Sequence, residues 1–450
     1  MKSNWKKVFT IVIIFLLELL INTNSVQASE KNNYDIISSS SNYSKVRSII
    51  INNKDNITYS IKKIGYIKAK VTNKTAKQIS TIVGKKDISS SSNINICSMY
   101  KRELPLSENF HFNFWPIQWD MKKVTENGED YKYLPSSSKV TIGLVDSGID
   151  LTHPALKNSI VKKGSVNLVP KGGKDGTEPD EKGKANDIND KLGHGTEVAG
   201  QLCSTQNIRG VFPGVKLHIY RVLGQKTSDP TWIIKGIIKS ADNNDSVINI
   251  SLGTYVLINN KQNKIIYKAW KRAISYAYRK GCIIVASVGE DSINENNPLD
   301  MLNIYKKINN IMHPEGTVKD TPALLKNVVS VGSSSPNDTV SNFSNYGQKV
   351  SFFAPGGDTS LYYQYGPEKW QQLDLTDQNL IATTALNNSY TYAYGTSFAA
   401  PKVSAILAAY IAKHNCYNQP HKVINFVKRK TNKNKNGLRI ISAKVLKYTN

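Results

Sequence analysis

Short apolar runs alternate with amphipathic segments between residues 139 and 415. Continuous apolar character over a strand's length indicates strands buried on both faces, as in a parallel sheet covered by helices. Four runs have this character, at 139–149, 247–253, 281–289 and 325–333. Segments with helical periodicity lie between and after them, at 194–204, 231–242, 265–281 and 397–415. The alternation predicts an α/β fold with a doubly wound, mostly parallel sheet flanked by helices.

The segment before this pattern is less apolar and is set apart by a polar stretch that begins near Ser89. Tyr66–Thr72 has the pattern of a strand, and residues 73–83 have that of a short helix opened by a polar cap. The serines at 89–92 indicate a loop or a weak edge strand. We therefore expect a small α+β module ahead of the main domain.

The first 28 residues have the layout of a secretory signal. Lysines precede an apolar run at 8–21, and a small-residue cleavage pattern ends at Ala28. A permanent membrane anchor is the alternative, but the run is short of the roughly 20 apolar residues that a spanning helix needs, and Glu18 interrupts it. The pattern favours removal of residues 1–28 and a secreted, extracellular protein.

Charge is concentrated at the two ends of the chain, which carries a net charge of +25. Residues 29–102 hold 14 Lys and Arg against 4 Asp and Glu, and residues 413–450 hold 10 against none. These ends are either solvated surface or sites of attraction to anionic cell-wall polymers or lipid headgroups. Nucleic acid is excluded as a partner because aromatic residues do not interleave with the basic ones and the chain carries an export signal.

The four cysteines are far apart and lack the paired spacing of a zinc site; they are Cys97, Cys203, Cys282 and Cys416. We expect these cysteines to be small buried residues rather than parts of a disulfide framework or a catalytic nucleophile.

Three chemically complementary side chains stand at the ends of predicted elements. Asp146 ends a buried strand, and His194 and Ser397 each open a helix. Strand carboxyl ends and helix amino ends gather at one edge of a doubly wound sheet. A serine hydroxyl needs a base to become a nucleophile, and that base needs an acid to orient it. Each residue alone has an ordinary alternative as a turn or helix cap, whereas the three together predict nucleophilic catalysis.

The segments that carry these residues, "DSGI", "GHGTEVAG" and "GTSFAAPKVSA", resemble the signatures of subtilisin-like serine proteases, in the same Asp, His, Ser order. The likeness extends over residues 114–412. It implies a propeptide at 29–102 that acts as inhibitor and folding chaperone, self-cleavage near Arg102, and a peptidase domain with a basic tail at 103–450. Glu197 and Lys402 stand where the family often has histidine, and Phe398 where it often has methionine.

One departure from the family affects the oxyanion site. The family places an asparagine side chain at the position of Glu290, and an ionised carboxylate would repel the developing negative charge. Loss of this donor in a subtilisin costs a factor of about 10² to 10³ in rate. Glu290 would compensate if it stayed protonated, or Asn294 or Asn296 would reach in from the loop. Full activity, reduced activity and a catalytically dead scaffold are all open alternatives.

Substrate-binding residues also follow from the resemblance. The family's primary pocket is walled by the segments that match Ser251, Leu252 and Gly253 and the turn from Gly289 to Asp291. Asp291 near the base of this pocket would favour arginine or lysine before the cut bond; its alternative is a solvated loop acid. Residues 227–232 match a strand that pairs with substrate, so Asp229 is a second candidate acidic contact.

Among secreted subtilases the chain looks most like the lantibiotic leader peptidases of Gram-positive bacteria, which cut a modified precursor after a basic residue, commonly arginine. A general secreted protease and a non-catalytic protein that binds peptide or cell wall are the alternatives. The resemblance implies a monomer and no cofactor for catalysis. The segment after the histidine helix is shorter than the usual calcium loop, and calcium elsewhere, on acids such as Asp120, Asp187 or Asp190, is not assignable.

Overall fold

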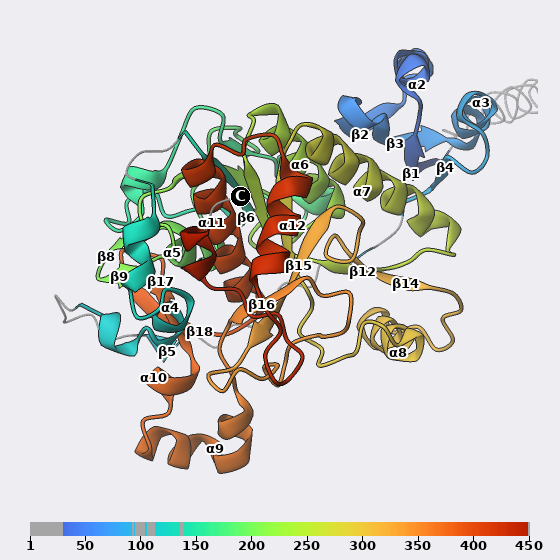
Figure 1. Cartoon of the computed structure of the whole chain (residues 1–450). Helices are drawn as coiled ribbons and strands as arrows, with labels where there is room; N and C mark the ends of the chain where they lie inside the picture. Colours follow the sequence, from blue (N-terminus) through green and yellow to red (C-terminus); the bar gives the residue numbers. More distant parts are fainter. Residues whose placement is uncertain (1–29, 92–93, 95–103, 106–112, 136–138, 449–450) are drawn as a thin grey trace, which may run out of the picture. The chain divides into compact units, whose positions relative to one another are not determined.

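A seven-stranded parallel sheet forms the centre of the computed structural model (Figure 1). Its strand order is β16-β15-β13-β11-β6-β10-β7, and all neighbouring strands pair in parallel. The strands are β6 (Thr141–Asp146), β7 (Val166–Asn167), β10 (Lys216–Arg221), β11 (Val247–Ile250), β13 (Ile283–Ser287), β15 (Val328–Ser334) and β16 (Phe352–Pro355). This topology confirms the predicted doubly wound sheet, and each of the four predicted runs contains a strand of it.

Helices cover both faces of the sheet, as the side chains of β6 demonstrate. Successive residues of a strand point to opposite faces. Ile142 and Leu144 share a core cluster with α11 (Thr396–His414), whereas Val145 lies against Gly236 of α6 (Pro230–Asp242). α5 (His194–Cys203) packs beside α11, and α7 (Lys261–Arg279) packs beside α6. The helices with the catalytic histidine and serine candidates therefore share one face.

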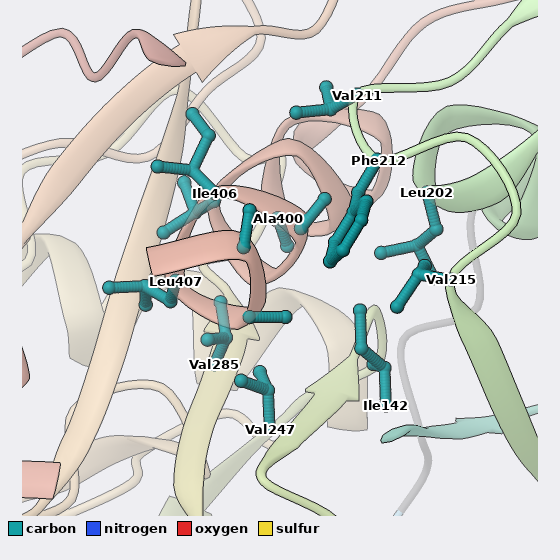
Figure 2. Packing of buried hydrophobic residues seen from close by; sticks show 14 of the residues in the cluster. Ile142, Leu202, Val211, Phe212, Val215, Val247, Val285, Ala400, Ile406 and Leu407 are labelled. Carbon is teal, nitrogen blue, oxygen red and sulfur yellow. The ribbon is translucent and has the colours of Figure 1, made fainter. Parts of the chain in front are cut away.

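The core between α11 and the sheet is made of aliphatic side chains with a few aromatic rings. Figure 2 shows Val247 and Val285 of the sheet below Leu407 and Ala400 of α11. Because α11 is buried along almost its whole length, its burial holds the serine at its first turn in place.

Smaller elements surround this core. Two antiparallel pairs flank it: β12 (Thr254–Leu257) with β14 (Val318–Thr321), and β17 (Ile381–Thr384) with β18 (Tyr390–Ala393), to which β5 (Leu104–Pro105) adds a third strand. A short β8 (Thr205–Gln206) and β9 (Ile208–Arg209) hairpin follows α5. The remaining α-helices are α4 (Trp119–Val124), α8 (Pro298–Asn309), α9 (Ser360–Gln372), α10 (Thr376–Asn379) and α12 (Pro420–Lys430). In Figure 1, α9 projects from the body of this unit.

The basic C-terminal segment is folded. Val423 and Phe426 of α12, together with Leu446, are buried in the same cluster as α11. Lys447 Nζ lies 3.1 Å from the buried Asp130 carboxylate. Part of the predicted basic tail is thus an integral layer of the main unit.

The N-terminal module is a separate compact unit with a hydrophobic core of its own. Its four-stranded antiparallel sheet has the order β2-β3-β1-β4, and two helices complete it. The elements are β1 (Lys31–Ile37), α2 (Ser40–Asn52), β2 (Asn56–Ile61), β3 (Tyr66–Thr72), α3 (Asn73–Val83) and β4 (Ile88–Ser90). The predicted strand at 66–72 and helix at 73–83 are confirmed, and the serine-rich stretch begins as an edge strand.

The structure describes residues 30–91, 94, 104–105, 113–135 and 139–448, and the two units divide between Ser91 and Ser92. The predicted signal at 1–28, Cys97 and the predicted cleavage site at Arg102 lie outside these ranges. Within them, no helix has both the length and the apolar character needed to cross a membrane. Cys203, Cys282 and Cys416 are buried thiols, as predicted.

Candidate active site

The acid and the base of the predicted triad are in contact. Asp146 is the last residue of β6 and is fully buried. His194 Nδ1 lies 2.7 Å from Asp146 Oδ1, and because a carboxylate only accepts hydrogen bonds, the imidazole N–H donates. Asp146 Oδ1 also accepts the backbone N–H of Ser147 over 2.7 Å. The carboxylate therefore fixes the ring orientation and leaves Nε2 as the basic nitrogen.

A close backbone approach places His194 beside the end of β6. The N–H of Gly195 donates to Ser147 Oγ over 2.8 Å. A Cβ on Gly195 would lie 2.1 Å from the carbonyl oxygen of Gly148, so only glycine permits this contact. The glycines of the histidine and aspartate motifs thus bring the two motifs together.

Ser397 occupies the first turn of α11 and is 1% exposed. Its hydroxyl donates to the carbonyl oxygen of Ser251 over 2.9 Å, and Ser251 Oγ donates back to the Ser397 carbonyl over 2.9 Å. The hydroxyl proton must therefore turn from Ser251 toward the imidazole before it can be transferred. Gly395, at φ 145°, makes the sharp turn that precedes the nucleophile.

A buried polar chain ties this turn to the sheet. Asn249 of β11 donates through Nδ2 to Ser251 Oγ over 3.1 Å, and Ser404 Oγ of α11 donates to Asn249 Oδ1 over 2.8 Å. Sequence reasoning missed Asn249 and Ser404. Asn249 is the single polar residue of the otherwise apolar strand β11, and this was the available signal, because a buried amide requires partners.

Glu290 lies beside the nucleophile's turn. Its Oε1 accepts the backbone N–H of Thr396 over 2.5 Å. Burial raises the pKa of Glu290 to about 8, although the hydrogen bonds from Thr396 and the nearby His194 lower it. At neutral pH the side chain is therefore mostly a neutral acid. Asn294 and Asn296, the alternative donors, contact each other in the following loop, and neither is among the described residues that line the catalytic pocket.

A cavity of about 400 Å³ opens at Ser397. Its lining includes every residue that the sequence assigned to the primary pocket, namely Ser251, Leu252, Gly253, Gly289 and Asp291. It also includes Asp320 of β14, which sequence reasoning missed and which is 2% exposed. A Cβ on Gly253 would lie 3.4 Å from Asp320 Oδ1, so the glycine leaves this carboxyl accessible to the pocket. Besides Glu290, two further acids, Asp291 and Asp320, therefore line the cavity.

The two acids are held by different partners. Asp291 Oδ2 accepts the hydroxyl of Tyr255 over 2.6 Å. Burial, together with the neighbouring carboxyl of Glu295, raises the pKa of Asp320 well above its ordinary value. Burial also raises the pKa of Glu295. Close carboxyl groups cannot both ionise at low energetic cost, so this pair retains a proton until a cation compensates the charge.

Asp229 has a different place from the one predicted. It is 5% exposed and caps α6: its Oδ1 accepts the backbone N–H of Thr231 over 2.9 Å and the Thr231 hydroxyl over 2.6 Å. Aspartate before a proline at the first helical position is a strong cap pattern. Asp229 is therefore a helix cap and not the acidic substrate contact expected from the sequence.

The acids considered for calcium are engaged by protein groups. Asp190 accepts four hydrogen bonds, from the backbone of Leu192, Gly193 and Thr196 and from the Thr196 hydroxyl. Asp187 pairs with Lys191 and Arg221. No group of three His, Cys, Asp or Glu within the described ranges is arranged to hold a metal ion.

Asp120 lies 2.9 Å from Lys402 Nζ, and both side chains are fully buried. Lys402 also donates to Gln201 Oε1 and to the Phe398 carbonyl, over 2.6 and 3.0 Å. This pair therefore connects α4 with the first turns of the serine helix.

Comparisons with known proteins agree with this geometry. The family model described as "Subtilase family" matches residues 137–441. The nisin leader peptide-processing serine protease of Lactococcus lactis subsp. lactis is 42% identical over 320 residues, which are 70% of this chain and 46% of the relative; the chain thus spans less than half of that protein. The epidermin leader peptide-processing serine protease of Staphylococcus epidermidis is 40% identical over 359 residues, 78% of this chain and 74% of the relative.

Solved structures show the same likeness. A crystal structure of the epidermin leader peptide processing serine protease from Staphylococcus aureus superposes with a TM-score of 0.82 and 33% identity, covering 93% of this chain and 98% of the other. A crystal structure of the nisin leader peptidase from Lactococcus lactis gives a TM-score of 0.70 and 40% identity, covering 75% and 94% of the two chains.

Proposed function

Because this chain belongs to the subtilase family of serine proteases, we propose that it is a secreted endopeptidase that removes the leader from a lantibiotic precursor by cutting after arginine. The observation that carries the proposal is the position of Ser397 beside a pocket lined by Asp291 and Asp320. Two relatives add the substrate class, since one is a nisin and the other an epidermin leader peptide-processing serine protease.

The three residues of the triad carry out the successive steps of peptide hydrolysis. Ser397 Oγ attacks the carbonyl carbon of the bond to be cut while His194 takes the hydroxyl proton. Asp146 stabilises the imidazolium that forms, through the 2.7 Å hydrogen bond to Nδ1. His194 then gives the proton to the leaving amine, and a water molecule releases the acyl group from Ser397 by the same sequence in reverse.

Negative charge develops on the carbonyl oxygen during this attack. The Ser397 backbone N–H at the first turn of α11 is one donor for it, aided by the helix dipole. We assign the second donor to the protonated carboxyl of Glu290. Its Oε1 is occupied by Thr396, which leaves the other oxygen to hold the proton. A pKa of about 8 keeps that proton in place at neutral pH.

Arginine fits the pocket on chemical grounds. A guanidinium binds carboxylates through several N–H groups in a fixed geometry, and a buried acid pair gains most from such a cation. Asp291 at the wall and Asp320 behind Gly253 would share the guanidinium. The Asp320 and Glu295 pair would release its proton as the cation enters.

Export and activation belong to the same proposal. The signal-like pattern at 1–28 supports secretion, and the separate folded unit before Ser92 is consistent with a propeptide that ends near Arg102. After self-cleavage the enzyme acts as a monomer, and the basic surface residues of the C-terminal segment attract anionic cell-wall polymers.

Two rival functions make different predictions. Glu290 in place of asparagine favours a non-catalytic peptide-binding protein, and the family also contains broadly acting proteases. We would incubate the purified protein with a lanthionine-containing precursor and, separately, with casein, and follow both by mass spectrometry. A single cut in the precursor with casein intact supports leader processing. Extensive casein digestion would indicate a general protease, and an unchanged precursor would indicate a binding protein.

A further inference from the structure

A second cavity, of about 380 Å³, lies next to the catalytic pocket, and four of its nine described lining residues are aromatic. Tyr362, Tyr363 and Trp370 come from α9, and Leu380 and Tyr394 come from the segments that follow it. We call this cavity the α9 pocket. None of its described lining residues is charged, so its chemistry suits an apolar or aromatic group.

The α9 pocket has a rigid wall. The indole N–H of Trp370 donates to Thr376 Oγ1 over 2.9 Å, and Trp370 is 5% exposed. The ring of Tyr362 meets Trp370 edge to face, with centroids 5.7 Å apart and an interplanar angle of 75°. Both rings are therefore held by neighbours, which lowers the entropy lost when a guest binds against them.

A kink in α9 creates the hollow. Gly366 has φ 77° and ψ 167°, outside the helical region, and Pro367 follows it. The glycine turns the chain so that residues before it and Trp370 after it face the same space. In Figure 1 this kinked helix projects from the main unit, where an incoming peptide can reach it.

The α9 pocket adjoins the catalytic pocket. Thr359, Tyr363 and Tyr394 line both cavities, and Tyr394 stands three residues before Ser397. Tyr363, at the junction, is 75% exposed. Its ring meets Tyr362 edge to face with centroids 5.8 Å apart, and the rest of its surface gains apolar contact when another molecule covers it.

The α9 pocket does not share the part of the catalytic pocket that the sequence assigned to the residue before the cut bond. Residues 251–253 and 289–291 wall the catalytic pocket. None of them is among the described residues that line the α9 pocket. If the residue before the cut bond occupies that walled region, the peptide beyond the cut leaves past Tyr394 and Tyr363. We propose that the α9 pocket binds an apolar side chain of the substrate on the C-terminal side of the bond that is cut.

The proposal rests on the proposed endopeptidase function, and its test separates the two. Peptides with arginine before the cut would carry either two isoleucines or two alanines directly after it. A second pair of peptides would carry two isoleucines or two alanines directly before the arginine. We expect kcat/KM to be about tenfold higher with isoleucine after the cut, as is typical when a pocket gains aliphatic contact.

Two tyrosines of α9 provide a matched comparison. Tyr363→Ala removes a wall of the α9 pocket, whereas Tyr365→Ala alters the same helix at a residue that packs on Lys369 and does not line the cavity. We expect Tyr363→Ala to reduce the tenfold isoleucine preference to about threefold or less. Tyr365→Ala should retain the full preference.

Three results would overturn the proposal: equal rates for both residues after the cut, a preference confined to positions before it, or equal effects of the two tyrosine variants. If the parent cleaves no peptide, the endopeptidase function fails and the pocket is then tested directly by calorimetry on the parent. About tenfold tighter binding of the isoleucine peptide would support the α9 pocket, and equal affinity would overturn it.

Discussion

The backbone N–H of Thr396, the residue before the nucleophile Ser397, donates to Glu290 Oε1 over 2.5 Å. This contact holds a carboxyl group where most subtilases have an amide. Whether Glu290 can serve as a donor to the oxyanion depends on its protonation, because a neutral carboxylic acid donates a hydrogen bond and a carboxylate does not.

Activity should therefore fall as the pH rises through about 8. Burial raises the pKa of Glu290 to about 8, so the side chain is neutral below that pH and charged above it. Ionisation removes a donor and adds a charge that repels the oxyanion. We expect kcat to decline above pH 8 in the parent and to stay level there in Glu290→Gln. The same alkaline decline in Glu290→Gln would contradict this assignment.

Glu290→Asn should raise turnover increasingly as the pH approaches and exceeds 8. An amide donates regardless of pH, whereas part of the Glu290 population is ionised even at neutral pH, given its pKa of about 8. Steady-state kcat at pH 7 and pH 9 measures the effect, which should be larger at pH 9. Unchanged or lower turnover at both values would mean that Glu290 does not face the oxyanion.

Asp320→Asn should reduce cleavage after arginine and leave cleavage after leucine nearly unchanged. A buried charged hydrogen bond contributes enough to predict a loss of roughly 10- to 100-fold in kcat/KM for arginine. The measurement is the ratio of kcat/KM for matched arginine and leucine peptides. If the ratio is the same in the variant and the parent, Asp320 does not determine specificity.

Asp229→Ala should affect stability and leave specificity unchanged. The carboxylate caps α6 through Thr231, and loss of such a cap lowers the free energy of unfolding by about 1 kcal/mol. Denaturant unfolding measures that change, and the arginine-to-leucine ratio is the control. A changed ratio with unaltered stability would restore the substrate contact first expected from the sequence.

The sheet and the contact between Asp146 and His194 could be predicted because their residues lie in contiguous sequence motifs. Continuous apolar runs mark β6, β11, β13 and β15, and the glycine-flanked motifs mark Asp146, His194 and Ser397. Asp229 is the exception, because its Asp-Pro-Thr sequence is a local cap pattern whereas the family resemblance implies a substrate contact.

Residues missed from the sequence are those whose neighbours are distant in the chain. Asp320 reaches the catalytic pocket through the antiparallel pairing of β14 with β12, in which it lies opposite Tyr255. No local pattern encodes that register. The α9 pocket was missed for a related reason, since Gly366 and Pro367 interrupt the periodicity by which a helix is recognised.

The most direct test of the account is mass spectrometry of two peptides, with Pro-Arg or Pro-Leu before the cut, incubated with the parent and with Ser397→Ala. The account predicts cleavage after arginine by the parent, slower cleavage after leucine, and no cleavage by Ser397→Ala. Cleavage of neither peptide by folded parent protein whose N-terminal unit has been removed, or equal cleavage by Ser397→Ala, would contradict it.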